Sequence, residues 1–413
     1  MAKHKLSAPS GESVKNKQPR ISVSGNLLAG KLPAGEIITD NSGKMWRIGK
    51  SIAVGGFGDI YLASDEIKKP VDRNSSYVVK AEFHTNGTLY TERHCYSRIG
   101  KIENIKEWMK CKSKRWLGVP TLIATGKHVF KGTMYRFIII ERFKDSLENL
   151  LKRQGSLHIS TVFSIGIKLL DILEYIHSFG YIHGDIKASN ILIHPASNEE
   201  IQIYLVDYGL ATKFAVNGVH KEEKEDKSRA HSGTTEFISR DGHKGIISRR
   251  SDLEILAFNF VRWMCHKLPW EDNLNDYDYV HERKSYFMSR ISHFIQTCFP
   301  HNSPEDLASY ISQVANLDYD EKPDYDFLRR ILSRGLTSRG IIYDDMVILD
   351  MDQHMNRRSM RAAMRHTQKT VTTLTTWEQA RSHHSAAETR PTDAMLKQMK
   401  LDCGTSHPVA TIG

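Results

Sequence analysis

Apolar residues recur with two different periods along this chain, and the change of period divides it into a strand-rich and a helix-rich part. Alternating or continuous apolar runs predict strands at residues 46–52, 77–81 and 135–141. Spacing typical of helices begins at residues 89–96 and is strongest at residues 161–179, where apolar side chains occupy most faces of the predicted helix. The pattern therefore predicts an α+β protein with its strands first and its helices second.

Two helical segments leave alternatives open. Asp252 begins a strongly apolar helix, where it suits either an N-cap or a brace for the backbone of a nearby loop. Residues 102–118 predict a basic helix capped by Gly118. That helix could contact nucleic acid, although a solvated face that braces its neighbour is the interpretation we prefer.

One polar stretch interrupts the apolar pattern after the long predicted helix. Residues 181–193 read Tyr-Ile-His-Gly-Asp-Ile-Lys-Ala-Ser-Asn-Ile-Leu-Ile, and Asp-Tyr-Gly follows at residues 207–209. Asp185 can accept the proton of a hydroxyl nucleophile, and Lys187 can neutralise a moving phosphate. Asn190 and Asp207 offer the oxygen ligands that Mg²⁺ prefers. A polar loop between two strands is the alternative, but the Asp-Tyr-Gly that follows favours phosphoryl transfer.

A glycine-rich turn lies between the first two predicted strands and reads Ala-Val-Gly-Gly-Phe-Gly-Asp-Ile-Tyr at residues 53–61. Such a turn lets backbone N–H groups approach phosphates that a Cβ atom would keep away. The usual G-x-G-x-x-G pattern would need glycine at position 53, where this chain has Ala53, whereas Gly55 and Gly58 are in place. On its own the pattern is also typical of a hairpin connection.

A lysine on the next predicted strand has a candidate partner on the helix that follows. Lys80 lies among β-branched residues, and a buried strand rarely carries lysine without a partner. Glu92 is the candidate, because a Lys–Glu pair on a strand and a helix can grip the α- and β-phosphates of a nucleotide. An exposed surface lysine is the alternative.

The amino-acid composition indicates what partners and which redox compartment suit the protein. The chain has 413 residues, a net charge of +10 and 40% hydrophobic residues, which suits a sizeable core and acidic partners such as nucleotide phosphates, nucleic acid or chromatin. Its five cysteines are scattered without a C-x-x-C pair, which argues against zinc or a disulfide framework and for a reducing compartment. We expect neither a signal peptide nor a membrane span.

The expected domain organisation follows from these patterns. Residues 1–40, rich in Ser, Lys, Gly and Pro, are expected to form a flexible basic arm, whose Lys15-Asn-Lys-Gln-Pro-Arg20 is either a weak nuclear signal or a solvated tail. Residues 41–340 form the folded domain, with a lobe boundary near residue 141. Residues 341–413 are expected to be mostly disordered, apart from a candidate short helix at 393–399.

Taken together, these motifs resemble a eukaryotic-type protein kinase. The resemblance is most specific to the vaccinia-related kinases, a branch of the casein kinase 1 group, and it covers roughly residues 40–340. The stretches that carry it are the loop at 181–190, Tyr-Leu-Val-Asp-Tyr-Gly-Leu at 204–210, Gly-Thr-Thr-Glu-Phe at 233–237, Ser-Arg-Arg-Ser-Asp-Leu-Glu-Ile-Leu at 248–256 and Leu-Pro-Trp-Glu-Asp-Asn-Leu at 268–274.

The resemblance implies a two-lobed fold with ATP and Mg²⁺ in the cleft. Lys80 would hold the phosphates with Glu92, Glu141 and Phe143 would offer hinge backbone to adenine beside Ile140, and Leu192 would lie under the base. Asp185 would be the catalytic base, assisted by Lys187, and Asn190 and Asp207 would hold Mg²⁺. The phosphates would be covered by Ile52, Ala53, Val54, Gly55, Gly56, Phe57, Gly58, Asp59 and Ile60.

The resemblance also implies a function and partners. Family members phosphorylate Ser or Thr of chromatin proteins, such as histone tails and the barrier-to-autointegration factor. We therefore expect a monomeric Ser/Thr kinase of the nucleus, and also of the cytoplasm, with weak nucleic-acid contact through its basic tails and no membrane attachment. Gly184 stands where most kinases have an arginine that binds an activation-loop phosphate, which suggests activity without that phosphorylation.

Two other functions compete with this one. A pseudokinase scaffold would bind partners without catalysing a reaction. The retained residues Lys80, Glu92, Asp185, Asn190 and Asp207 argue against a scaffold, and only Ala53 favours it. A chromatin-binding module that acts through its basic tails would instead show salt-dependent binding to DNA.

Overall fold

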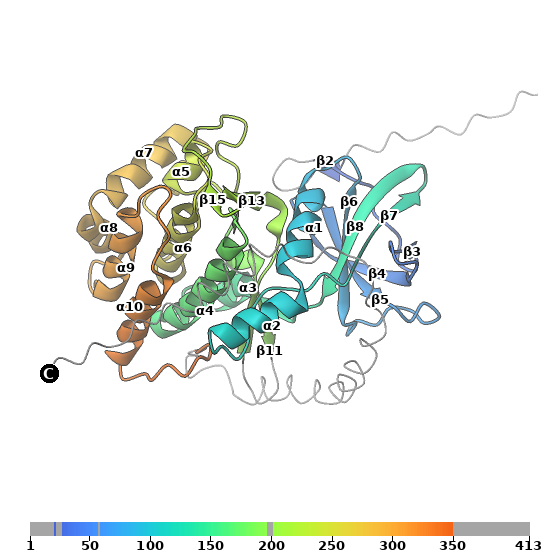
Figure 1. The fold of residues 1–413 in the computed structure, drawn as a ribbon, viewed down its shortest axis with the longest axis horizontal. Helices are drawn as coiled ribbons and strands as arrows, with labels where there is room; N and C mark the ends of the chain where they lie inside the picture. The colour runs from blue at the N-terminus through green and yellow to red at the C-terminus, as the bar shows by residue number, and fades with distance from the viewer. Residues whose placement is uncertain (1–19, 22–26, 57, 196–200, 350–413) are drawn as a thin grey trace, which may run out of the picture. The chain divides into compact units, whose positions relative to one another are not determined.

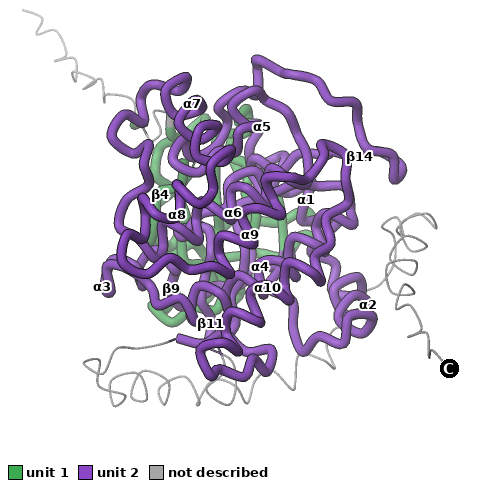
Figure 2. The backbone as a smooth tube through the Cα atoms, turned by 90° about the vertical axis from the view of Figure 1, so that its left-hand side faces the viewer, with its two compact units in different colours: residues 1–86, 124–139 green, residues 87–123, 140–413 purple. Residues whose placement is uncertain are grey.

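The predicted change of period corresponds to a division of the structure into two units (Figure 2). Residues 20–21, 27–56, 58–195 and 201–349 are described by the structure, which is a computed structural model of the chain. The first unit contains the residues up to 86 together with 124–139, and the second contains 87–123 and the residues from 140 onward.

The first unit is built on one six-stranded sheet (Figure 1). Its strand order is β3-β4-β5-β6-β8-β7, and a separate pair, β1 and β2, is antiparallel. Trp46, Ile48 and Phe137 are among the buried side chains of this sheet. The strands are β1 (Arg20–Ile21), β2 (Leu27–Leu28), β3 (Ile37–Thr39), β4 (Met45–Val54), β5 (Gly58–Ser64), β6 (Tyr77–Phe83), β7 (Ala124–Phe130) and β8 (Thr133–Glu141).

The prediction of a flexible arm over residues 1–40 is wrong for its last third. Leu28 and Leu32 are buried, and the backbone N–H of Leu32 donates to the Tyr61 hydroxyl at 3.0 Å. Tyr135 donates to the carbonyl of Gly30 at 2.9 Å, so two strands of the sheet hold this segment by their tyrosines. The apolar residues among its Ser and Gly were too few to show a period, so the sequence did not reveal this packing. Residues 1–19, with most of the candidate nuclear signal, lie outside the described residues.

The second unit is mostly helical. Its helices are α1 (Thr88–Ile99), α2 (Ile102–Cys111), α3 (Leu147–Gln154), α4 (Ile159–Ser178), α5 (Arg240–His243), α6 (Arg249–Met264), α7 (Tyr277–Met288), α8 (Ile291–Cys298), α9 (Glu305–Ala315) and α10 (Tyr325–Thr337). Its short strands are β9 (Asp145–Ser146), β10 (Tyr181–Ile182), β11 (Ile191–Pro195), β12 (Ile201–Leu205), β13 (Thr212–Lys213), β14 (Ala215–Val216) and β15 (Val219–His220).

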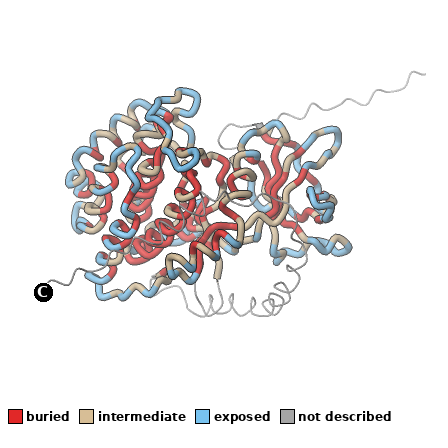
Figure 3. Tube along the Cα trace, viewed as in Figure 1, coloured by how far each residue is buried: buried red, intermediate tan, exposed pale blue. Residues whose placement is uncertain are grey.

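The core of the second unit is centred on α4. The helix is buried along almost its whole length (Figure 3), as its apolar residues on most sides predict. Gly166 allows α6 to approach closely, because a Cβ atom there would lie 2.5 Å from the ring of Phe260. Among the described helices, none combines the length and the apolar content needed to cross a membrane.

The segment predicted as a basic helix over residues 102–118 is shorter than expected. The helix α2 ends at Cys111, and Gly118 is not its cap. Gly118 instead contacts β12, since a Cβ atom there would meet the carbonyl of Ile203 and its own carbonyl accepts from Leu205 at 3.0 Å. Trp108 packs edge-on against Tyr175 of α4, so α2 braces its neighbour. The helices α1 and α2 also belong to the second unit, whereas the sequence predicts them in the first lobe.

The C-terminal region is predicted to be mostly disordered from residue 341, but part of residues 341–349 packs against α4. Val347 is buried, and the N–H of Ile348 donates to the hydroxyl of Ser164 at 2.9 Å. Asp345 pairs with the Nζ of Lys168 at 2.7 Å, and the Lys168 side chain is 1% exposed. A buried lysine on α4 therefore retains this segment, while residues 350–413 lie outside the described residues.

The Asp345–Lys168 pair predicts a loss of stability. Asp345→Ala should lower the free energy of unfolding by about 3 kcal/mol, since it leaves a buried ammonium without its nearest carboxylate. Lys168→Met combined with Asp345→Ala should recover most of that loss, because the buried ammonium is then gone and Lys114, which also contacts Asp345 at 3.6 Å, keeps Asp171 at 3.0 Å. Urea unfolding of the full chain measures both effects, and equal midpoints for Asp345→Ala and the wild type would contradict the role of the pair.

Candidate functional site

The predicted catalytic loop connects the end of α4 to the β11–β12 hairpin. β10 pairs with β13, a short 3-10 turn covers Ala188–Asn190, and β11 then pairs with β12 from Ile191 opposite Leu205 onward. This hairpin brings the Asp-Tyr-Gly motif next to the loop, and the N–H of Val206 donates to the carbonyl of Asn190 at 2.9 Å. Two polar stretches separated by about fifteen residues therefore meet at one place in the second unit.

Three side chains form a closed triangle at the loop. The Nζ of Lys187 lies 2.8 Å from Oδ2 of Asp185 and donates to the hydroxyl of Thr234 at 2.8 Å. Thr234 in turn donates to Oδ1 of Asp185 from its hydroxyl at 2.7 Å and from its backbone N–H at 3.1 Å. The carboxylate of Asp185 is thus held in one orientation beside a cation, as general-base and phosphate-neutralising roles require.

The two predicted metal ligands lie beside this triangle. The amide nitrogen of Asn190 donates to the carbonyl of Asp185 at 2.9 Å and to its Oδ2 at 3.2 Å, which directs the amide oxygen of Asn190 elsewhere. Asp207 adopts a left-handed backbone with φ of 66°, which is rare outside glycine and is found at functional turns. An amide oxygen and a carboxylate suit Mg²⁺. Nowhere in the described part of the chain do three His, Cys, Asp or Glu side chains gather in a group that could hold a metal ion.

A buried carboxylate holds the backbone of the loop. Asp252 is 0% exposed, and its oxygens accept from the backbone N–H groups of His183 at 2.7 Å and Gly184 at 2.8 Å. Gly184 has φ of 80°, a conformation that favours glycine. Of the two roles left open for Asp252, the structure shows the brace, because Ser248 precedes the first turn of α6 as its N-cap residue.

The carboxylate of Asp252 also contacts a buried histidine, His177. The Nε2 of His177 lies 2.9 Å from Oδ2 of Asp252, and its Nδ1 lies 2.5 Å from the hydroxyl of Tyr325. Burial lowers the pKa of His177 below its ordinary value, although Asp252 opposes this effect. For Asp252, burial alone would raise the pKa of the carboxyl, but the bonds from His177 and the loop outweigh it and the pKa is lowered. A neutral His177 that donates from Nε2 and accepts from Tyr325 fits both contacts.

The tyrosine of Asp-Tyr-Gly anchors the motif to α1. Tyr208 is fully buried, and its ring packs edge-on against Tyr96 with centroids 5.1 Å apart and against His183 at 4.9 Å. Glu92 lies on the same helix as Tyr96 and is also buried. Hence α1 packs directly on the motif that carries Asp207, within the second unit.

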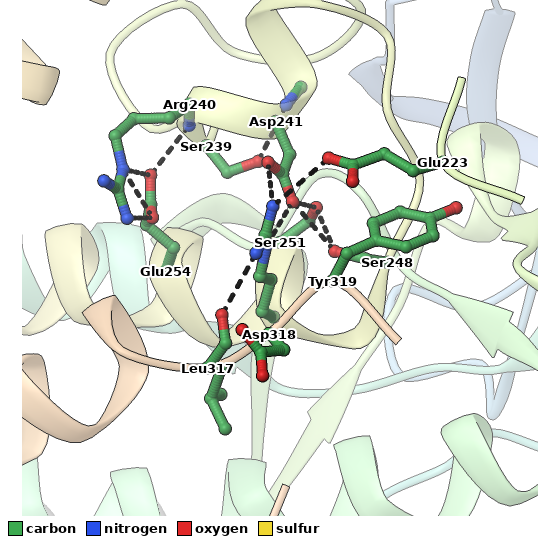
Figure 4. Close-up of polar contacts among 12 residues, drawn as sticks. Glu223, Ser239, Arg240, Asp241, Ser248, Ser251, Glu254, Leu317, Asp318 and Tyr319 are labelled. Atoms are coloured by element: carbon green, nitrogen blue, oxygen red, sulfur yellow. Dashed lines mark hydrogen bonds and ion pairs between the residues drawn. The ribbon is translucent and has the colours of Figure 1, made fainter. Parts of the chain in front are cut away.

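The segment that follows Thr234 is fastened to α6 (Figure 4). Arg240 forms a two-pronged ion pair with Glu254, and Asp241 accepts from the guanidinium of Arg250 at 2.7 and 3.0 Å. Ser248 also donates to Asp241 at 3.0 Å. The chain between Thr234 and α6 is therefore fixed on the helix that carries Asp252.

Comparison with known proteins identifies the family. Residues 47–339 match the protein kinase domain. The chain is 36% identical over 306 residues to the B1 kinase of vaccinia virus (strain Ankara), of which it covers 98%. The chain belongs to the vaccinia-related kinase family. A solved structure of vaccinia related kinase 3 agrees, with a TM-score of 0.69, 30% identity, and coverage of 78% of this chain and 96% of that chain.

Two longer relatives are also similar. The chain is 41% identical over 303 residues to human serine/threonine-protein kinase VRK2, which is 73% of this chain and 59% of the relative. It is 37% identical over 339 residues to nucleosomal histone kinase 1 of Drosophila melanogaster, which is 81% of this chain and 55% of the relative. The chain thus spans less than two thirds of the length of these two proteins. The predicted family and the kinase fold with a β-rich and a helical lobe are confirmed.

The residues predicted to contact the base, Glu141, Phe143 and Leu192, all belong to the second unit. The ring of Phe143 packs on Tyr204 of β12 with centroids 4.4 Å apart. Leu192 of β11 is the register partner of that tyrosine and of Ser146. Glu141 ends β8 and is exposed. Phe143 and Leu192 therefore both neighbour Tyr204 of β12, while their contact with adenine stays a prediction.

The predicted phosphate-covering residues lie in the first unit. The strands β4 and β5 form the expected hairpin around Gly55, whose N–H donates to the carbonyl of Gly58 at 2.7 Å. Gly58 cannot be replaced, because a Cβ atom there would lie 2.3 Å from the carbonyl of Ala81. The Asp59 carboxylate accepts two bonds from Arg20 at 2.8 and 2.9 Å, so its side chain is engaged within the unit. Phe57 lies outside the described residues.

Lys80 is buried in β6 and is the register partner of Ile60. This position places it on the strand next to the glycine-rich turn, as predicted. Its pairing with Glu92 stays a prediction, since Lys80 belongs to the first unit and Glu92 to the second.

Sequence reasoning missed two contributors to the site. Thr234 was quoted only as part of a family motif, and His177 only as part of a helix pattern. Their contacts join residues 49 and 75 positions apart in the chain, so no local spacing could reveal them. The one available signal was the Gly-Thr-Thr sequence that follows a charged stretch.

The buried His177 predicts how stability depends on pH. Its pKa is lowered in the folded state, so the unfolded chain takes up a proton first, and stability is lost as the pH falls below the ordinary value of 6.5. His177→Gln can still donate to Asp252 but cannot titrate. Urea unfolding between pH 8 and pH 5.5 should show a shallower decline for this variant, by up to about 1.4 kcal/mol per pH unit. Parallel declines would contradict the assignment.

Proposed function

We propose that this chain is a serine/threonine protein kinase that transfers the γ-phosphate of ATP to hydroxyl groups of protein substrates. The triangle of Asp185, Lys187 and Thr234 carries the proposal, because it presents an oriented carboxylate and a cation at the same point. The family relationship supports it, as the similar proteins are named as kinases.

In this proposal each residue of the loop has one task. Asp185 accepts the proton of the substrate hydroxyl as that oxygen attacks phosphorus. Lys187 neutralises charge on the transferred phosphoryl group. Thr234 orients the side chains of Asp185 and Lys187 through its hydroxyl. Asn190 and Asp207 would hold Mg²⁺, which when bound neutralises the phosphates of the nucleotide. Lys80 with Glu92 would hold those phosphates under residues 52–60, and the Glu141–Phe143 backbone with Leu192 would take the base.

We further propose that the substrates are chromatin proteins and that the protein acts in the nucleus. One similar protein is named a nucleosomal histone kinase. The net charge of +10 supports weak contact of the tails with nucleic acid. The wider activities of the longer relatives are not carried over, because this chain spans only part of their length.

Phosphate transfer from Mg²⁺-ATP to histone or casein tests the proposal. Asp185→Asn should lower kcat by about 10²–10⁴-fold, as expected for loss of a general base, with little change in nucleotide affinity. Lys80→Met should mainly weaken nucleotide binding and activity. Asp320→Asn and Lys69→Met, at exposed positions, serve as matched controls and should retain activity. A wild type that binds ATP and transfers nothing would favour the pseudokinase scaffold.

A second measurement tests the consequence of Gly184. Because Asp252 and Thr234 already hold the loop, activity should not require a phosphate on the activation segment. Treatment with phosphatase, followed by its removal, should leave kcat within about twofold of the untreated protein. Abolished activity after this treatment would show that a phosphate is needed to order the segment.

A further inference from the structure

A buried lysine of α7 holds the segment Gly233–Ile238, and the proposed chemistry does not use this lysine. Lys284 of α7 is 0% exposed, and its ammonium donates to the backbone carbonyls of Thr235 and Ile238, each at 2.7 Å. Nε2 of His243 lies 3.3 Å from the same nitrogen. An ammonium has three N–H donors, and here all three have an acceptor.

The acceptor on the third side is a neutral histidine. Burial, and then the charge of Lys284, lower the pKa of His243 to about 2, so the ring is neutral at neutral pH, and its Nε2 accepts from the ammonium of Lys284. Its Nδ1 lies 3.1 Å from Nδ1 of His231, to which it donates in this tautomer. The contacts around Lys284 thus form a directed chain from the ammonium through His243 to His231.

The surroundings of the ammonium are otherwise apolar or acidic. It lies 5.5 Å from the ring centroids of Phe258 and Trp270. Burial lowers the pKa of Lys284 to about 7, while Glu254 and Glu236 oppose that shift. Burying a cation between aromatic rings costs free energy unless all its hydrogen bonds are made. We therefore asked which part of the structure depends on the hydrogen bonds of this ammonium.

Two further side chains, Trp270 and Arg262, also hold this segment. Trp270 donates to the carbonyl of Glu236 at 2.8 Å, and Arg262 donates to the Glu236 carboxylate at 2.9 Å. Three carbonyls of residues 235–238 thus accept from buried side chains: that of Glu236 from Trp270, and those of Thr235 and Ile238 from Lys284.

The link to the catalytic loop is short. Thr235 follows Thr234, whose hydroxyl contacts both Asp185 and Lys187. The N–H groups of Phe237 and Ile238 donate to the carbonyl of Thr234, at 2.8 and 3.0 Å, and close a turn around it. A shift of the carbonyl of Thr235 therefore moves the threonine that orients the proposed base.

We propose that Lys284 is a positioning residue for phosphoryl transfer, whose buried ammonium fixes the segment Gly233–Ile238 and thereby Thr234 against Asp185. This inference rests on the proposed kinase function and deepens it. Lys284 cannot touch a substrate, since it is completely buried, so it acts only through the segment. Its removal should impair transfer to protein while the binding of ATP, which involves other residues, stays intact.

The test uses the full chain with Lys284→Met and Lys284→Gln. Methionine has similar length but no donor, whereas glutamine keeps an amide that can satisfy one carbonyl. Steady-state transfer to casein should fall in kcat/KM by about a hundredfold for Met, since a displacement near 1 Å costs this much. The kcat/KM of Lys284→Gln for casein should lie between those of Lys284→Met and the wild type. The KM for ATP should stay within about twofold of the wild-type value in both variants.

Amide hydrogen exchange provides a readout independent of activity. The amides of Phe237 and Ile238 should exchange at least about tenfold faster in Lys284→Met, while the amides inside α4 keep their wild-type rates. Lys267→Met, at an exposed lysine, controls for the substitution. Leu332→Ala, at a buried position of α10, controls for lost stability and should leave exchange at residues 237–238 and the KM for casein unchanged.

The outcomes separate this inference from the proposed function. An active wild type with an equally active Lys284→Met, or with unchanged exchange at residues 237–238, overturns the role of Lys284 alone. A wild type without transfer overturns the proposed function and the positioning role together. If Lys284→Met does not fold, Lys284→Gln decides: reduced transfer with faster exchange supports the proposal, and wild-type values of both refute it.

Discussion

The buried carboxylate of Asp252 is the contact on which the proposed catalytic loop depends. It accepts two backbone N–H groups of the loop and one bond from His177, and Asp252, His177 and His183 are all buried. Bonds to a charged acceptor are stronger than neutral ones, and a buried carboxylate that lost them would be very costly. These bonds therefore hold the loop backbone in the conformation from which Asp185 is presented.

The same principle applies to the other buried charges of the helical unit. Lys168 is compensated by Asp345, Lys284 by two carbonyls and a histidine, and Arg329 by Asp171 at 3.0 Å and Glu174 at 2.7 Å. Each of these contacts joins segments far apart in sequence. Because burial of an unpaired charge is unfavourable, each pair selects one way of packing its segments. Charges thus specify the arrangement of helices that apolar contacts alone would leave less defined.

Gly184 lets the loop be held through its backbone alone, because this residue has no side chain. Its left-handed backbone directs its N–H at Asp252, and the loop is held without a side chain at that position. The activation segment is instead fastened by Thr234 to the loop, by Lys284 to α7, and by Arg240 and Asp241 to α6. The order of this segment follows from contacts that are present in the unmodified chain.

The sequence by itself determined the kinase fold, the long buried helix and the stretch with Asp185, Lys187, Asn190 and Asp207, because these depend on local periodicity and on short motifs. It did not determine that residues 27–40 and 341–349 belong to the folded units, since a few apolar side chains and one charge among polar residues show no period. Nor could it choose the brace over the cap for Asp252, or find Thr234, His177 and Lys284. Their roles arise from contacts between residues 46 to 75 positions apart, and only the packing of α6 and α7 against the loop brings those residues together.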